Sequence, residues 1–188
     1  APIDINTTTN TDCNRTGLVL GNAVTTDNCS VVSVTNDAPA AFPLGTTTVT
    51  WTVVDGSGNT ATATQIVTVT DATLPTVITQ NITVQLNANG QATITAANVN
   101  NGSFDNCAVN TLSVSPASFD CSNVGPNTVT LTVTDVNGNV NTGTAIVTVV
   151  DAIAPVFGNV GTITVNAANN AAGANVNYNV SAVDACGS

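Results

Sequence analysis

The chain has 188 residues, a formal net charge of −10 and a single cation, Arg15. These values exclude nucleic acid as a partner, because binding to phosphates requires clustered Lys and Arg side chains. The sequence has no His, Lys or Glu. A general base or an activated nucleophile is hard to assemble without them, so we expect no enzyme. No apolar run reaches the roughly 18 residues of a membrane-spanning helix, so we expect no membrane span in this segment.

Short motifs recur along the chain with a period of about 80 residues, the size of one small β domain. One motif holds an Asp and a Cys: it reads TTDNCS at 25–30, SFDNCA at 103–108 and AVDACG at 182–187. A second motif reads DATLPT at 71–76 and DAIAPV at 151–156, and the opening API matches its end. The chain is therefore predicted to consist of tandem repeats of one domain type.

The Pro-containing links set the expected domain boundaries, because Pro restricts the backbone and favours a short, stiff connection. We predict a first repeat over 1–73, a second over 74–153 and the first part of a third over 154–188. The third part lacks the second half of a repeat, so its strands have unpaired edges. Further sequence is the simpler way to complete it, and a strand donated by a neighbouring subunit is the alternative.

The strands of each repeat are expected where apolar residues alternate with Thr, as in TVTWTVVD and TVTLTVTD. Residues 80–99 predict a hairpin, with Asn89 and Gly90 in its turn. No segment has a convincing helical period. We therefore predict an all-β fold, made of tandem immunoglobulin-like antiparallel β-sandwich repeats of about 80 residues. The inner faces of the alternating strands are expected to hold Val49, Trp51, Val53, Val129, Leu131 and Val133.

These motifs resemble one known family. The first repeat, with TDNC, FPLGTTTVTWTVVDGSGNTATATQIVTVTD and a following Pro, is similar to the hyalin-repeat (HYR) family. The second repeat keeps DNC, TVTLTVTDVNGN and the closing VTVVD, but has SNVGPNT where the first has FPLGTT. The resemblance implies an immunoglobulin-like fold, an extracellular location, often at the bacterial cell surface, and an adhesive or structural role. It implies no particular ligand.

Carboxylates recur at fixed places in the repeats. The predicted strand order brings the loop with Asp105 and the turn that starts at Asp135 to the same end of the second repeat. The last strand of the first repeat delivers Asp71 to that end across a short link. Like charges at such a distance repel one another, and calcium takes six to eight oxygen ligands in flexible geometry. We therefore predict one calcium ion (Ca2+) at each link.

The expected metal ligands form three sets, one for each link. The alternative is turn chemistry alone, because Asp and Asn side chains accept hydrogen bonds from the backbone of tight turns. DGSGN and DVNGN are good turn sequences by themselves. The three sets are Asp71, Asp105, Asn106, Asp135 and Asn139; then Asp151 and Asp184; and finally Asp27, Asn28, Asp55 and Asn59, which would take an Asp from an upstream repeat.

The five cysteines are expected to form disulfides, since the absence of His and of CxxC spacing argues against zinc. The shortest loops pair Cys13 with Cys29 and Cys107 with Cys121, each within one repeat. Chain entropy predicts about 3 kcal/mol of stabilisation from each. Cys186 is then unpaired, with any partner beyond the chain or on another chain. Buried free thiols are the alternative to disulfides.

The leading hypothesis is a non-catalytic structural segment of an extracellular bacterial surface protein or filament, such as a stalk, an adhesin arm or a fibre subunit. Its expected partners are further copies of the same repeat or subunit. The alternative is a binding module that recognises a glycan or a host or cell-surface protein through exposed loops. Exposed aromatic residues would favour that alternative, and the candidates are Phe42, Phe104 and Phe119.

Overall fold

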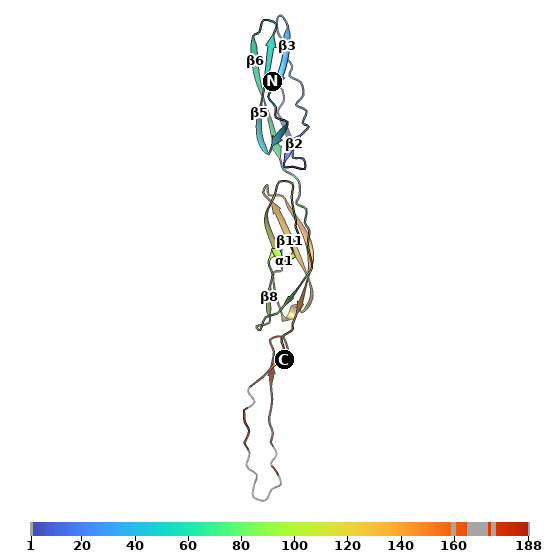
Figure 1. Cartoon of the computed structure of the whole chain (residues 1–188), viewed down its shortest axis with the longest axis vertical. Coiled ribbons are helices and arrows are strands. Elements are labelled where there is room, and N and C mark those ends of the chain that lie inside the picture. Colours follow the sequence, from blue (N-terminus) through green and yellow to red (C-terminus); the bar gives the residue numbers. More distant parts are fainter. Residues whose placement is uncertain (1, 159–160, 165–172, 174–175, 188) are drawn as a thin grey trace. The chain divides into compact units, whose positions relative to one another are not determined.

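The computed structural model describes residues 2–158, 161–164, 173 and 176–187. Strands dominate the described chain, which confirms the predicted all-β fold (Figure 1). The chain forms two compact units, each assembled from segments that are distant in sequence. Unit 1 combines 1–78 with 102–112 and 132–142, and unit 2 combines 79–101, 113–131 and 143–188. The boundaries of the three sequence repeats stay a prediction.

The main sheet of unit 1 has the strand order β1-β6-β5-β3. Its two long strands are antiparallel, with Gly45 opposite Val69 and Val54 opposite Thr60. The first strand pairs parallel with β6, so both strands run toward the same end of the sheet. A second, two-stranded sheet pairs β2 with β4. The strands are β1 (Ile5–Thr8), β2 (Asn14–Thr16), β3 (Val31–Asn36), β4 (Ala41–Pro43), β5 (Gly45–Asp55) and β6 (Thr60–Thr70).

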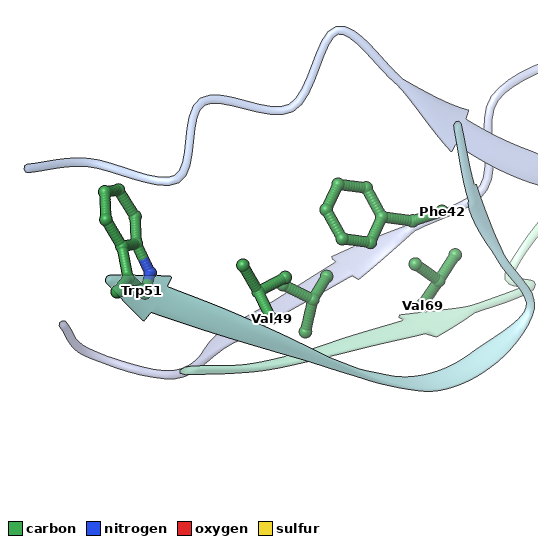
Figure 2. Packing of buried hydrophobic residues seen from close by; sticks show 5 residues of the cluster. Phe42, Val49, Trp51 and Val69 are labelled. Atoms are coloured by element: carbon green, nitrogen blue, oxygen red, sulfur yellow. The ribbon is translucent and has the colours of Figure 1, made fainter. Parts of the chain in front are cut away.

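The core of unit 1 is small and lies between these two sheets. Figure 2 shows the rings of Phe42 and Trp51 and the side chains of Val49 and Val69 pointing into this space. Val49 and Val69 are at most 1% exposed, and both rings are buried. The predicted inner positions of Val49 and Trp51 are confirmed, whereas Val53 is half-buried. One bulky aromatic from each sheet thus fills a space that aliphatic residues alone would leave loosely packed.

A buried polar side chain ties this core to the loops around it. Gln65 is 1% exposed, and its Oε1 accepts a hydrogen bond from the Trp51 indole N–H at 3.0 Å. Its Nε2 donates to the carbonyl oxygens of Ile3 at 2.7 Å and Leu20 at 3.1 Å. A buried amide is tolerated because these bonds use its acceptor and both of its donors. Gln65 therefore fixes two segments without regular secondary structure against the sheet.

Three long strands contribute residues to both units: β9 (Val109–Ser115), β11 (Gly125–Asp135) and β12 (Val140–Val150). They belong to a sheet with the order β7-β12-β11-β9, in which β7 (Ile82–Gln85) pairs parallel with β12. This arrangement repeats that of the first main sheet. The predicted inner residues Val129, Leu131 and Val133 are fully buried.

The hairpin predicted over 80–99 is wrong in unit 2. The chain does reverse there, because the Asn87 N–H donates to the Gln91 carbonyl at 2.9 Å and Gly90 has a φ of +70°. The two flanking strands then join different sheets, since β8 pairs with β10 instead of β7. A short helix, α1, follows where strand was expected. The remaining elements of unit 2 are β8 (Gln91–Thr93), α1 (Ala96–Val99), β10 (Ser118–Asp120), η1 (Cys121–Asn123), β13 (Val156–Phe157) and β14 (Ala182–Val183).

Candidate metal centre

Two of the predicted carboxylates meet in unit 1. Asp71 directly follows β6, and Asp105 lies in the loop that leads into β9. One carboxylate oxygen of each, together with the Sγ of Cys107, lie within 4.8 Å of one another. Both Asp side chains are half-buried. The strand-end argument from the sequence therefore correctly predicted that Asp71 and Asp105 lie close together.

One oxygen of each carboxylate is held by the protein. Asp71 Oδ1 accepts hydrogen bonds from the Thr9 hydroxyl and the Thr73 N–H, both at 3.0 Å. Asp105 Oδ2 accepts from the Cys107 N–H at 2.8 Å. Neither Thr9 nor Thr73 was expected from the sequence. Thr9 reaches this cluster because β1 pairs parallel with β6, so the end of β1 lies beside the end of β6.

The neighbouring amide completes the cluster. Asn106 uses its Nδ2 group to donate to the Asn10 carbonyl at 3.1 Å and to the Thr9 hydroxyl oxygen at 3.2 Å. These bonds leave the amide oxygen as the remaining group. The side chain is thus oriented by its donors, with its acceptor free for another ligand.

Three oxygens of this cluster are buried without a hydrogen-bond partner: Asp71 Oδ2, Asp105 Oδ1 and Asn106 Oδ1. A buried acceptor without a donor is costly, and buried polar groups in proteins are normally paired. A cation would compensate both the missing donors and the repulsion of the carboxylates. Three hard oxygen atoms on a short loop and a strand end fit calcium, whose other positions are filled by carbonyls or water.

A related cluster lies in unit 2. One carboxylate oxygen each from Asp151 and Asp184 and the Cys186 Sγ lie within 4.8 Å of one another. Each Asp also accepts a backbone hydrogen bond, from the Ile153 N–H at 3.0 Å and the Cys186 N–H at 2.7 Å. This cluster has Ala185 where the first has Asn106, and Asp151 is exposed. The second cluster therefore has one oxygen ligand fewer than the first, and it is more exposed to water.

The cysteines beside these clusters are already bonded, so they are not thiolate ligands. Cys13 forms a disulfide with Cys107, and Cys121 forms one with Cys186. Both predicted pairings, Cys13 with Cys29 and Cys107 with Cys121, are wrong, and so is the unpaired state of Cys186. Cys29 is the free and exposed thiol. Each disulfide joins one predicted repeat to the next.

Strand direction explains why the first predicted pair cannot form. Cys13 follows β1, which ends beside Thr70 at one end of the sheet. Cys29 precedes β3, where Val31 lies opposite Asp55 at the other end of β5. An 11-residue strand spans about 35 Å, whereas a disulfide requires Cα atoms roughly 4.4–6.8 Å apart. Closeness in sequence was therefore the wrong criterion.

Two pairs of predicted ligands have the turn role that the sequence analysis named as the alternative. Asp135 Oδ1 accepts from the Asn137 and Asn139 N–H groups, both at 2.8 Å, and Oδ2 accepts from Asn139 Nδ2 at 2.8 Å. Asp55 makes the same three bonds to Ser57 and Asn59. The oxygens of both carboxylates are thus occupied. Asn139 Nδ2 also donates to the Asp71 carbonyl at 3.4 Å, which links this turn to the cluster of Asp71 and Asp105.

The last predicted set lies at the opposite end of the first main sheet. Asp27 Oδ1 accepts from the Cys29 N–H at 2.8 Å and the Ser30 N–H at 3.0 Å. Asp27 and Asn28 are exposed. The structure places no third carboxylate with Asp27 and Asp55 among the residues it describes. A metal role there stays a prediction that depends on an upstream Asp.

The two equivalent turns give a matched test of buried charge. Burial favours a higher pKa for Asp135, but the hydrogen bonds from Asn139, Asn137 and Gly138 outweigh it, so its pKa is lowered. The Asn59 side chain and backbone lower the pKa of Asp55 in the same way, at a position that is only half-buried. A lowered pKa stabilises the fold above the pKa of the unfolded chain, and this contribution is lost as the pH falls through the folded value.

We expect Asp135→Ala to lower the free energy of unfolding by about 2 kcal/mol at neutral pH, because it leaves buried donors without an acceptor. Asp55→Ala should cost clearly less, since water replaces its bonds. Urea unfolding at neutral pH and near pH 3 would measure both effects. The cost of Asp135→Ala should shrink at the acidic pH, because the carboxylate of the unfolded wild-type chain is largely protonated there and the charged form held in the fold then contributes less to stability. Equal costs for the two variants would contradict the role of burial.

Comparisons with known proteins agree with the family resemblance of the first repeat. Residues 4–69 match the model of the HYR domain, which confirms the hyalin-repeat resemblance over that stretch. No curated protein matches this chain in sequence. Within the described residues, no helix is both long enough and apolar enough to cross a membrane.

The solved structures that match this chain are distant in sequence. The EC21–23 segment of human CDH23 is 17% identical, and the alignment covers 98% of this chain and 84% of that one with a TM-score of 0.41. Extracellular cadherin domains 1–4 of protocadherin gamma B7 are 14% identical with a TM-score of 0.37, over 69% of this chain and 44% of that one. Fibronectin(III)-like modules of Clostridium thermocellum CbhA are 13% identical with a TM-score of 0.31, over 69% and 83% of the two chains.

Proposed function

We propose that the protein is a non-catalytic structural segment of an extracellular bacterial surface protein or filament, in which calcium and disulfides restrain the links between tandem repeats. One observation carries this proposal. At both links, the Asp that ends one repeat lies within 4.8 Å of the Asp and the disulfide-bonded Cys of the next repeat's motif. The HYR match and the two disulfides support an extracellular location. The bacterial surface rests on the family resemblance alone.

A link that resists a pulling force needs both a disulfide and a bound ion. The disulfide limits how far the joined segments separate, and an ion between Asp71 and Asp105 would fix their orientation. Calcium sites of extracellular modules often have dissociation constants of about 10⁻⁴–10⁻³ M, which suits a site that fills outside the cell. The first cluster should bind more tightly than the second, because Asn106 adds an oxygen that Ala185 cannot provide.

Calcium titration of the full chain tests this proposal. Calorimetry should show two classes of site, and small-angle scattering should show a narrower range of conformations when both are filled. Asp71→Asn with Asp105→Asn should remove the tighter class, and Asp151→Asn with Asp184→Asn the weaker one. Asp12→Asn is the control, because Asp12 is an exposed carboxylate near the first cluster but outside it. No binding up to about 10 mM, well above the usual range, would contradict the proposal.

One observation favours the binding-module alternative. Phe42 and Phe119 are buried in the cores, but Phe104 and Leu74 are each 57% exposed. Both line a surface pocket of about 680 Å³ beside the first cluster, together with Arg15. An exposed aromatic ring next to a cation and several amides is the kind of surface that contacts a sugar or a protein loop. Binding to a glycan panel that is lost in Phe104→Ala, with both disulfides intact, would support this second candidate.

A further inference from the structure

The free thiol occupies a motif position whose two counterparts are both disulfide-bonded. Cys29 belongs to TDNC, Cys107 to FDNC and Cys186 to VDAC. Cys107 and Cys186 each bond to a cysteine of the preceding sequence repeat. Cys29 is exposed and free. Cys29 therefore has the motif position of Cys107 and Cys186, which both form disulfides, but it has no partner in this chain.

The loop around Cys29 shares backbone hydrogen bonds with the bonded examples. The N–H of each motif Cys donates to the Asp two residues earlier, at 2.8 Å for Cys29, 2.8 Å for Cys107 and 2.7 Å for Cys186. The carbonyl of the next residue is also held alike. Ser30 O accepts from the Gly56 N–H and Ala108 O from the Val136 N–H, both at 3.1 Å. These bonds are thus present around Cys29 without a disulfide.

The two existing bonds also define how a partner presents its cysteine. Cys13 directly precedes β2, and Cys121 directly follows β10. These strands belong to the equivalent two-stranded sheets, β2 with β4 and β10 with β8, and both positions lie at the same end of that sheet. At the position equivalent to Cys13, the second repeat has Gly90, whose φ of +70° resembles the +54° of Cys13. A Cβ built on Gly90 would lie 2.6 Å from Cys121 Sγ and 3.4 Å from Cys186 Sγ.

We propose that Cys29 is the attachment site for a third inter-repeat disulfide, formed with a cysteine of a further repeat of this kind placed N-terminal to it. The partner cysteine would lie at either of the two positions held by Cys13 and Cys121 in their own repeats. The two thiols would lose two protons and two electrons, and their sulfurs would form the new bond. A small disulfide such as oxidised glutathione would accept the electrons and become two thiols. This inference does not depend on calcium.

A tandem fusion tests the proposal. Residues 74–153 are placed directly before residue 1 of the full chain, which recreates the link sequence DAIAP found at 151–155. Cys107 of the added copy is changed to Ser, because its own partner is missing. After refolding with oxidised and reduced glutathione, free thiols are alkylated and the disulfides are mapped by mass spectrometry. Nearly all Cys29 should be alkylated in the parent chain and almost none in the fusion, where it should be bonded to Cys121 of the added copy.

Two variants of the fusion make the outcome decisive. Cys121→Ser in the added copy should restore alkylation of Cys29. Gly90→Cys with Cys121→Leu in the added copy should move the bond to the new cysteine, as in the first repeat, which has Leu44 at the second position. Formation of Cys13–Cys107 and Cys121–Cys186 in the same sample shows that the chain has folded. If these two bonds form while Cys29 stays alkylated, or links two chains through Cys29, the proposal is overturned.

Discussion

Replacing both Cys13 and Cys107 by Ser is expected to lower the free energy of unfolding of unit 1 by about 4 kcal/mol, since the bond closes a very long loop. The two cysteines are 94 residues apart, and chain entropy assigns about 4.7 kcal/mol to a loop of 100 residues. Both cysteines belong to unit 1. Replacing both cysteines avoids the separate effect of a lone thiol beside the carboxylates of Asp71 and Asp105.

The chain provides its own reporter for this measurement. Its single Trp, Trp51, lies in the core of the same unit, so fluorescence during urea unfolding follows that unit. Cys29→Ser is the matched control, because it removes a thiol that bonds to nothing here and should leave the midpoint unchanged. Equal midpoints for the control and the double variant would show that the disulfide does not stabilise unit 1.

Asp105→Asn is expected to have opposite effects with and without calcium. Without the ion, the variant replaces one of two close carboxylates by an amide that keeps the acceptor for the Cys107 N–H. Its NH₂ group gains Asp71 as an acceptor. Relief of the repulsion between half-buried carboxylates should raise the free energy of unfolding by about 1 kcal/mol, after allowance for solvent screening.

With calcium, the wild type should become at least as stable as Asp105→Asn. A site with a dissociation constant of about 1 mM gains about 1.4 kcal/mol at 10 mM calcium, and the variant should gain little. Trp51 fluorescence in a chelator and in calcium would measure both changes, with Asp12→Asn as the control. A variant less stable than the wild type in chelator would contradict the idea that the two carboxylates repel. An unchanged calcium gain would remove Asp105 from the site.

The sequence predicted the sheets better than their connections. Alternation of apolar residues with Thr located β5 and β11, because a half-buried strand must place every second side chain inward. It also correctly placed Asp71 near Asp105, since that step needed only the direction of successive strands. The hairpin over 80–99 was wrong because local turn signals do not tell whether the flanking strands remain in one sheet.

The same limit explains the mixed outcome for the acidic residues. Asp55 and Asp135 follow strands as regularly as Asp71 does, and composition cannot separate a turn cap from a metal ligand. Their hydrogen bonds differ: both oxygens of Asp135 accept bonds from its own turn, whereas Asp71 and Asp105 each keep one buried oxygen without a donor, which supports the calcium site that we propose at the second pair. Thr9 and Asn10 were missed because they join the cluster only through the parallel pairing of β1 with β6.

The amino-acid sequence alone was enough to predict the all-β fold and the HYR character of the first repeat. These properties follow from composition and from local periodicity, which every folded arrangement of the chain must satisfy. The pairing of the cysteines and the oxygens that lack donors could be seen only in the folded chain. Both depend on which strand ends meet in space, and residues 94 apart in the chain can lie closer than residues 16 apart when a strand of about 35 Å separates the nearer pair.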